Sequence, residues 1–447
     1  MKIWRRYVSR RLRVFFGLLL LVLLLWIMLP YDHPVRLSAR FNVKAFSTAL
    51  SSYLWGRWWL TEQRGFPVSL SDDVAVLLKS GFGTRDRISA WLEAHEHVDF
   101  TNLLLVGDFA MQPDHLFGYH GRRLPVHDMV AWMFERGYLS VDLDHPRLTK
   151  YSELSAAVAN DDLATARELS NAFGWELDAL KFISSLELCY ELMPDKKWYI
   201  MADDDTYIMQ PALELLLEHL DPAVPYYVGN AVGDYKGRFA HGGSSVILSQ
   251  AAMRKLFSHP KVVSSAHLES LGETWGDRLL ATTLMKVGIY LNEDYMIFFN
   301  GGPPRATRVT EGRLCVPIVS FHKLSPSEMV NVGRRFNHNN ELILWIDLWD
   351  IYAAPSLDSP ILKTGRENWD HVGTLDETTM TVHKIPSAQD CVKICHRHWK
   401  SCLAWTWESE HQNCHISNWL IPGDRAEGKT SGINVPRTKD LVRKCRS

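Results

Sequence analysis

Three consecutive aspartates, Asp203, Asp204 and Asp205, follow the short apolar run "KWYIMA" near the middle of the chain. Carboxylates crowded at the end of a strand repel one another, whereas a divalent cation with oxygen ligands offsets that repulsion. Mg²⁺ and Mn²⁺ suit this role when phosphate oxygens complete the coordination shell. The triplet therefore indicates a site for a metal-bound phosphate ligand. The alternative is an acidic turn that complements the dipole of the next helix.

Two later residues carry side chains that could complete such a site. His322 follows the apolar run "VPIVSF", so it is expected at a strand end, where histidine serves as a metal ligand or as a structural residue. Asp277 in "TWGDRLL" is expected at a helix start. A carboxylate there can take a proton from a hydroxyl, or it can simply interact with the helix dipole. Glu273 is the reserve candidate for the base.

The elements that must position these residues alternate between strands and helices. Short apolar runs occur at "DVAVLLKSG", "TNLLLVGDF", "KWYIMA" and "PYYVGN", and amphipathic segments lie between them. This alternation predicts an α/β fold with a doubly wound, mainly parallel sheet over residues 71–335. Ligands of such sheets bind outside the carboxyl ends of the strands. Asp108 ends the second run and Lys181 lies on the helix before the triplet, so both are candidate ligand-binding residues.

The N-terminal segment predicts a membrane anchor. Residues 1–13 are rich in Lys and Arg, and residues 14–29, "VFFGLLLLVLLLWIML", carry no charge. The run suits an uncleaved signal anchor, because no small-residue cleavage site follows it. Positive charge on its N-terminal side favours a cytoplasmic tail, a luminal remainder and a single-pass type II protein. The short span favours the Golgi or the endoplasmic reticulum, and residues 30–70 are expected to form a stem.

Composition and cysteine distribution add two further expectations. The net charge of -2 argues against a nucleic-acid partner. Residues 336–385 are irregular and are expected to be a linker or a peripheral segment, whereas residues 386–447 are rich in cysteine. In an oxidising lumen this favours a disulfide-stapled unit over a zinc site. Its cysteines are Cys391, Cys395, Cys402, Cys414 and Cys445, and Cys189 and Cys315 lie upstream.

The segment "WYIMADDDTYIM" resembles the strand and Asp-x-Asp motif of the Fringe-like β-1,3-glycosyltransferases (glycosyltransferase family 31), especially their fungal-type members. In the same order as in that family, similar segments are "GFGTRDRISAWL", "NLLLVGDFA", "RFAHGGSSVILSQAAM", "ETWGDRLLATTLMKVGI" and "PIVSFHKLSPSEM". The resemblance implies a GT-A fold, a nucleotide-sugar donor that is usually a UDP-sugar, and Mn²⁺ or Mg²⁺. It also implies inverting transfer to a hydroxyl of a glycan or glycoprotein, with a β-1,3 linkage.

The resemblance also implies roles for individual residues. Asp205 and His322 would ligate the metal with Asp203 beside it, and Asp277 would be the catalytic base. The residues expected to contact the donor are Asp108, Lys181, Asp203, Asp204, Gly242 and Gly243. Ser245 departs from the pattern, because the family has glycine there followed by an aromatic residue, and this affects the expected acceptor contacts.

The C-terminal segment, from "DCVKICHRH" to "GKTSG", resembles a PAN/apple module. Spacing alone allows three connectivities for four cysteines, and the resemblance implies the nested pairs Cys391–Cys414 and Cys395–Cys402. The partner of Cys445 stays open between another protein, Cys189, Cys315 and none, and the two upstream cysteines could instead pair with each other. Such modules bind protein or carbohydrate. The alternative function is therefore a membrane-anchored binding protein that presents this module beside a decayed transferase domain.

Overall fold

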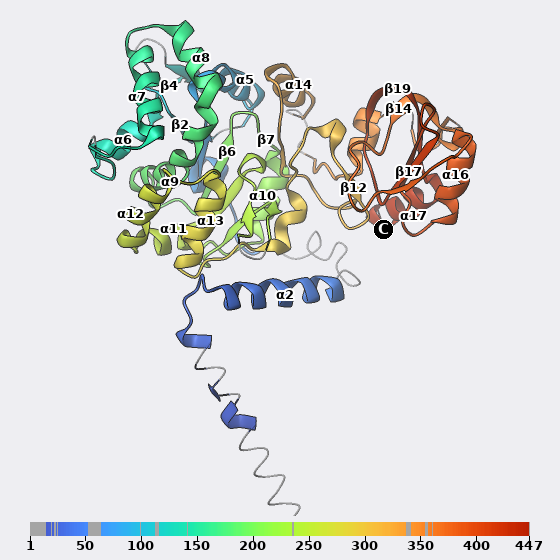
Figure 1. The fold of residues 1–447 in the computed structure, drawn as a ribbon, viewed down its shortest axis with the longest axis horizontal. Coiled ribbons are helices and arrows are strands. Elements are labelled where there is room, and N and C mark those ends of the chain that lie inside the picture. The colour runs from blue at the N-terminus through green and yellow to red at the C-terminus, as the bar shows by residue number, and fades with distance from the viewer. Residues whose placement is uncertain are drawn as a thin grey trace, which may run out of the picture.

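A computed structural model describes residues 15–446 except 19, 22–23, 25, 52–63, 99, 112–115, 141, 235–236, 337–340, 354–355 and 360. Within this part of the chain, no helix has both the length and the apolarity needed to cross a membrane. The expected tail at 1–13 lies outside the described residues, as does part of the expected anchor at 14–29. The helix α2 (Pro34–Ser51) lies beside the α/β domain (Figure 1). Just before this helix, Tyr31 O accepts a hydrogen bond from Tyr290 Oη of the domain.

A six-stranded mixed sheet forms the centre of the α/β domain. Its strands, in spatial order, are β5 (Val126–Asp128), β2 (Asn102–Gly107), β1 (Val74–Lys79), β6 (Trp198–Asp203), β11 (Val246–Ser249) and β8 (Tyr227–Gly229). The first four run parallel, and β11 is antiparallel to both of its neighbours. The expected, mainly parallel sheet is confirmed.

Two helical layers cover the sheet, because alternate side chains of each strand point to opposite faces. Val74, Val76 and Leu78 of β1 belong to one buried core, which also includes residues of α5 (Asp86–Ala94) and α10 (Gln210–Glu218). Ala75 and Leu77 belong to a second core. That core packs against α9 (Lys181–Leu192), α11 (Gln250–Phe257) and α13 (Gly276–Lys286). Both faces of the sheet are therefore covered by packed apolar side chains, and ligands must approach at the strand ends.

Several further helices extend the two layers of the domain. Their bounds are α6 (Met129–Glu135), α7 (Pro146–Ala159), α8 (Leu163–Phe173), α12 (Pro260–Glu269) and α14 (Pro326–Phe336). A short 3₁₀ helix, η2 (Gly174–Leu180), leads directly into α9. Two short strands, β7 (Tyr207–Ile208) and β13 (Ser320–Phe321), pair antiparallel, so they bring the late chain segment back beside the end of β6.

The C-terminal unit contains a second sheet, five-stranded and antiparallel, against which α15 (Ile361–Thr364) and α16 (Ala388–Arg397) pack. The strands, in spatial order, are β14 (Arg366–Asp370), β19 (Asp424–Ile433), β16 (Ala404–Glu408), β17 (Asn413–Ser417) and β15 (Met380–Val382). The disulfides Cys391–Cys414 and Cys395–Cys402 form the expected nested pairs. Residues 336–385, expected to be a linker or a peripheral segment, supply the two edge strands β14 and β15, whose register is set by partners more than thirty residues away.

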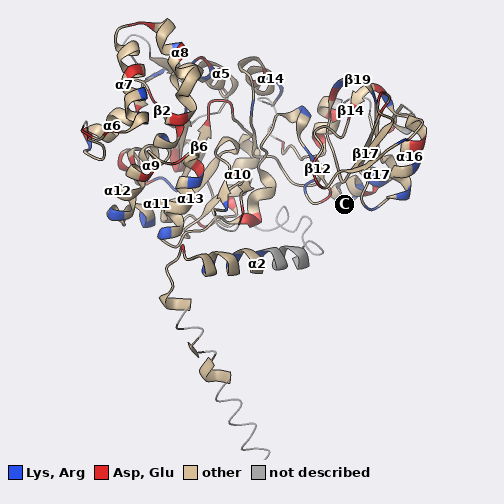
Figure 2. Cartoon of the chain, viewed as in Figure 1, with Lys and Arg blue, Asp and Glu red and all other residues tan. Residues whose placement is uncertain are grey.

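The C-terminal unit is joined to the α/β domain by three kinds of contact. β12 (Val309–Thr310) pairs antiparallel with β18 (Trp419–Leu420), and Arg437 lies 2.9 Å from Glu311. A third disulfide joins Cys315 to Cys445, while Cys189 is free and buried. The expectation that Cys189 and Cys315 could pair with each other is therefore wrong. Figure 1 shows the two parts side by side, and basic and acidic residues are interspersed over both (Figure 2).

Candidate active site

A cavity of about 410 Å³ lies at the carboxyl ends of β1 and β6, where an open α/β sheet is expected to bind ligands. All the expected site residues line it except Asp108 and the reserve candidate Glu273. A larger cavity of about 670 Å³ lies between α2 and the domain. Only the smaller one contains a cluster suited to a metal ion among the residues that the structure describes. We therefore take the smaller cavity as the candidate active site.

One side of this cavity gathers three candidate metal ligands. One ligand atom each of Asp203, Asp205 and His322 lies within 4.8 Å of the other two. His322 Nε2 is 3.2 Å from Asp205 Oδ1. The other ring nitrogen, His322 Nδ1, is buried and has no hydrogen-bond partner among the described residues. Two carboxylates and an imidazole whose ligand atoms lie this close together fit a divalent cation such as Mn²⁺ or Mg²⁺.

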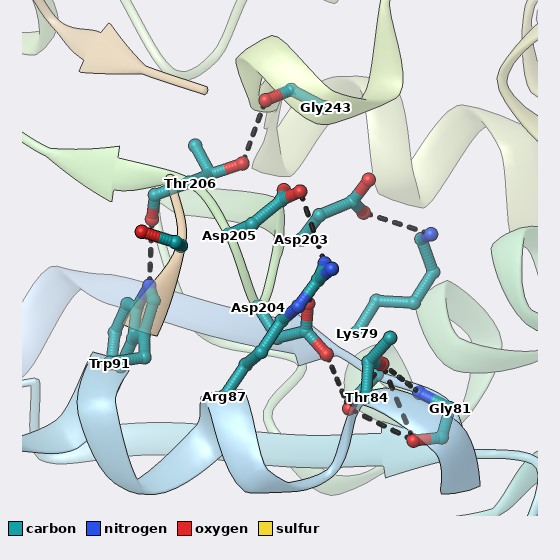
Figure 3. Close-up of polar contacts among 12 residues, drawn as sticks. Lys79, Gly81, Thr84, Arg87, Trp91, Asp203, Asp204, Asp205, Thr206 and Gly243 are labelled. Atoms are coloured by element: carbon teal, nitrogen blue, oxygen red, sulfur yellow. Dashed lines mark hydrogen bonds and ion pairs between the residues drawn. The ribbon is translucent and has the colours of Figure 1, made fainter. Parts of the chain in front are cut away.

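The glycine-rich loop explains how His322 reaches the triplet. A Cβ atom on Gly243 would lie 2.2 Å from His322 Nε2, so only glycine leaves room for the imidazole. Thr206, the residue after the triplet, donates from Oγ1 to Gly243 O at 2.7 Å. Trp91 Nε1 donates to Thr206 O at 2.8 Å, which ties the turn to α5 (Figure 3). The triplet, the loop and the histidine therefore form one connected structure.

The second aspartate of the triplet has different surroundings from the third. Asp204 is only 5% exposed and accepts a hydrogen bond of 2.6 Å from Ser80 Oγ. Burial raises the pKa of Asp204 to about 6. Burial alone would also raise the pKa of Asp205, but His322 and Arg87 lower it below its ordinary value. Asp204 therefore supports the loop after β1, while Asp205 stays ionised beside the histidine.

Three residues that the sequence did not single out complete the polar network. Lys79 Nζ lies 2.6 Å from Asp178 and 2.8 Å from Asp203. Burial alone would lower the pKa of Lys79, but these two carboxylates raise it, so the ammonium stays charged. Arg87 Nη1 lies 3.2 Å from Asp205 and 3.4 Å from Asp204 (Figure 3). Lys79 could have been identified from the sequence, because it is the only charged residue of a strand that is otherwise fully apolar.

Asp108 and Lys181 form a buried ion pair, and of the two only Lys181 lines the cavity. Asp108 is completely buried, accepts a hydrogen bond from Phe82 N at 2.9 Å and lies 3.0 Å from Lys181 Nζ. A side chain on Gly81 would contact its carboxylate, so this backbone separates Asp108 from the cavity. The expected direct contact of Asp108 with a ligand therefore does not follow from its position. Lys181 lines the cavity and also donates to Ser80 O.

Asp277 lies in the first turn of α13 and lines the same cavity. Its Oδ2 accepts a hydrogen bond from Gly242 N at 2.9 Å, and its Oδ1 accepts one from Arg278 N at 2.8 Å. Burial raises the pKa of Asp277, although these two hydrogen bonds oppose the rise. The reserve candidate, Glu273, does not line the cavity. A carboxylate that is held in place by two hydrogen bonds and has a raised pKa is suited to accept a proton near neutral pH.

Ser245 adopts a backbone conformation that favours glycine. Its φ of +69° and ψ of 149° lie in a region that residues with a Cβ rarely occupy. The residue is fully buried, and its Oγ has no hydrogen-bond partner among the described residues. The serine at this position therefore strains the loop. This agrees with the pattern of the family that the sequence resembles, which has glycine at this position.

Comparisons with known proteins agree with this geometry over part of the chain. Residues 119–278 match the Fringe-like family model. A segment of 95 residues is 30% identical to a human chondroitin sulfate glucuronyltransferase; it covers 20% of this chain and 12% of that protein. These two similarities support a glycosyltransferase. The aspartate triplet and Asp277 lie inside the family match, whereas His322 lies beyond its end.

Proposed function

We propose that this protein is a metal-dependent, inverting glycosyltransferase with a GT-A fold. It transfers a sugar from a nucleotide-sugar, a UDP-sugar in this proposal, to a glycan or glycoprotein hydroxyl and forms a β-1,3 linkage. One observation carries the proposal: a cluster of metal-ligand types and a separately held carboxylate line a single cavity. A binding protein with a decayed site has no need to keep both.

Asp203, Asp205 and His322 would hold the metal ion, Mn²⁺ or Mg²⁺. Such an ion, when bound, supplies Lewis-acid stabilisation of the negative charge that develops on a leaving diphosphate. Lys181 and Arg87 line the same cavity and add positive charge for the phosphates. Gly242 and Gly243 let the donor approach the backbone of the loop closely.

Asp277 would act as the general base in this proposal. A hydroxyl that attacks a sugar carbon must lose its proton, and a carboxylate within hydrogen-bond reach can accept it. The hydrogen bonds from Gly242 N and Arg278 N fix the direction of the Asp277 carboxylate. Because the pKa of Asp277 is raised, its ionised form is a stronger base than an ordinary aspartate.

The cellular setting is part of the proposal. The basic segment and the apolar run at residues 14–29 would anchor the protein as a single-pass type II protein of the Golgi or endoplasmic reticulum. The three disulfides suit the oxidising lumen of these organelles. The C-terminal unit would serve as a PAN/apple-like module that binds protein or carbohydrate near the acceptor.

Ligand-induced stabilisation tests the proposal directly. The thermal stability of the full chain in detergent is measured with Mn²⁺ and a panel of nucleotides. UDP with Mn²⁺ is expected to raise the free energy of unfolding by about 2.7 kcal/mol at one hundred times Kd. Asp205→Ala should abolish this rise, whereas Asp195→Ala should keep it, because Asp195 is exposed before the opposite end of β6. No stabilisation by any nucleotide would favour a binding protein instead.

A further inference from the structure

Two exposed tryptophans line the candidate active site. Trp175 is 61% exposed and Trp275 is 56% exposed, and both border the cavity of the aspartate triplet. Large apolar side chains left in water often mark a binding surface. Trp399, which is 40% exposed, belongs to the C-terminal unit and does not line this cavity. Trp175 and Trp275 therefore differ from Trp399 in that they are both exposed and located at the candidate active site.

Trp275 is held next to the proposed base. It immediately precedes α13, and its carbonyl accepts a hydrogen bond of 3.1 Å from Leu279 N, which starts the helix that carries Asp277. The ring centroid of Trp275 lies 6.3 Å from that of the buried Phe239. The ring is therefore supported at one side while more than half of its surface stays open to a ligand.

Trp175 comes from the neighbouring element, η2. A Cβ atom on Gly276 would lie 2.9 Å from the Cα of Ala179, so η2 and the start of α13 touch. Asp178, one residue before that contact, binds Lys79 at the bottom of the cavity. The two tryptophans are therefore presented by two packed elements that also carry carboxylates of the site.

The chemistry of the site indicates which ligand such rings would contact. The donor diphosphate belongs beside the metal ligands, and the attacking hydroxyl must reach Asp277. A side chain beside Asp277 is therefore on the acceptor side. A pyranose has a face of C–H groups that can pack on an indole, while its hydroxyls point outward to polar partners such as carboxylates.

We propose that Trp275 and Trp175 form the acceptor subsite and pack against the C–H face of the acceptor sugar, which orients its hydroxyl toward Asp277. This inference rests on the proposed glycosyltransferase function. Trp275 is the main platform, because it is two residues from the base and is supported by Phe239. Trp175 extends the surface toward the next sugar of the acceptor.

The test compares acceptor dependence with donor dependence in the full chain. UDP release from a UDP-sugar panel with Mn²⁺ is measured with and without p-nitrophenyl β-glycosides of glucose, galactose, xylose and N-acetylglucosamine. The variants are Trp275→Ala, Trp175→Ala and Trp275→Phe, with Trp399→Ala as the matched loss of an exposed indole. Trp275→Ala should raise the acceptor KM roughly tenfold or more, because truncation of a central aromatic contact has effects of this size.

The controls separate this inference from the proposed function. Trp275→Phe should recover most of the acceptor affinity, Trp175→Ala should have a smaller effect, and Trp399→Ala should have none. Stabilisation by UDP with Mn²⁺ should persist in every variant, and Trp399→Ala should also leave UDP release without acceptor unchanged. An unchanged acceptor KM in both Trp175→Ala and Trp275→Ala, with donor cleavage intact, would overturn the acceptor subsite alone. A wild-type protein that neither binds UDP nor releases it would overturn the proposed function itself.

Discussion

Two aspartates with little exposure, Asp204 beside the cavity and Asp370 in the C-terminal sheet, have opposite electrostatic surroundings. Burial raises the pKa of Asp204 to about 6, and its main donor is Ser80 Oγ. Burial would also raise the pKa of Asp370, but hydrogen bonds from Gly373 N, Thr406 Oγ1 and Lys429 Nζ lower it. The C-terminal unit thus satisfies its buried charge.

The difference distinguishes the C-terminal unit, where this buried charge is paired, from the candidate active site, where carboxylates are crowded. In the C-terminal unit, paired polar groups and disulfides add to the free energy of unfolding. In the cavity, the carboxylates of Asp203 and Asp205 lie close together, and His322 Nδ1 is buried without a hydrogen-bond partner among the described residues; both features lower stability. Substitutions in the cavity should therefore affect chemistry most, and substitutions in the C-terminal unit should affect stability most.

The largest expected effect is the loss of activity on replacing the proposed base. Asp277→Asn should lower the transfer rate by about 10² to 10⁴, because the amide cannot accept the acceptor proton. Stabilisation by UDP with Mn²⁺ should persist. Glu273→Gln is the matched control, because Glu273 lies outside the cavity, and it should keep full activity. Equal rates for Asp277→Asn and wild type would require another base.

The disulfide between the two regions gives the largest expected effect on stability. Cys315 and Cys445 are 130 residues apart, so replacing both with serine should lower the free energy of unfolding by roughly 5 kcal/mol. The same change at Cys395 and Cys402, only 7 residues apart, should lower it by roughly 2 kcal/mol. Denaturant unfolding measures both values. Loss of UDP binding in the first variant would show that the regions are not separable.

The pH dependence of the two aspartates should have opposite signs. The raised pKa of Asp204 means that its ionisation weakens the fold as pH rises from about 4 to about 6. Asp204→Asn should therefore raise the free energy of unfolding at pH 7 by up to roughly 3 kcal/mol, and the gain should vanish near pH 4. The lowered pKa of Asp370 makes its ionised form stabilising, so Asp370→Asn should destabilise at pH 7.

Unfolding at pH 4 and pH 7, without metal, measures both effects. Two variants that destabilise by the same amount at pH 7 would contradict the contrast between Asp204 and Asp370. A gain for Asp204→Asn that is as large at pH 4 as at pH 7 would show that its cause is not ionisation.

The smallest expected effect concerns the strained loop. Ser245→Gly should raise the free energy of unfolding by about 1 kcal/mol, because glycine adopts a φ of +69° without strain. Ser244→Gly is the matched control in the same loop. It should destabilise, since Ser244 Oγ accepts a hydrogen bond from Asn230 at 3.2 Å. A destabilised Ser245→Gly variant would show that the serine is not a strained residue.

The sequence predicted the residues that local pattern can place. Apolar runs located β1, β2 and β6, and the triplet was correctly placed at the end of β6, where the sequence predicts a ligand site. It missed the contact of Lys79 with Asp203, because that contact depends on which strands are neighbours, namely β1 and β6 in register. It placed Asp108 correctly at a strand end but could not show that the Gly81 backbone covers it.

The C-terminal region shows the same limit. Cysteine spacing left the partner of Cys445 open, and only the packing of α17 (Val435–Arg446) beside the α/β domain selects Cys315. The sequence predicted a linker or a peripheral segment where β14 and β15 lie. Edge strands with mixed polarity lack the apolar alternation of a half-buried strand, so the pattern did not indicate them. Tertiary partners, rather than local sequence, determine both features.

The link between Cys315 and Cys445 also sets an order of events during synthesis. His322 lies seven residues after Cys315, and the ribosome reaches Cys445 only after 123 further residues have been made. The segment that delivers the histidine to the aspartates is therefore covalently fixed only after the C-terminal unit has emerged. A chain that stalls before that point carries the aspartate triplet but lacks the bond that fastens the segment bearing its histidine. Covalent fixation of the histidine segment thus requires prior synthesis of the C-terminal unit.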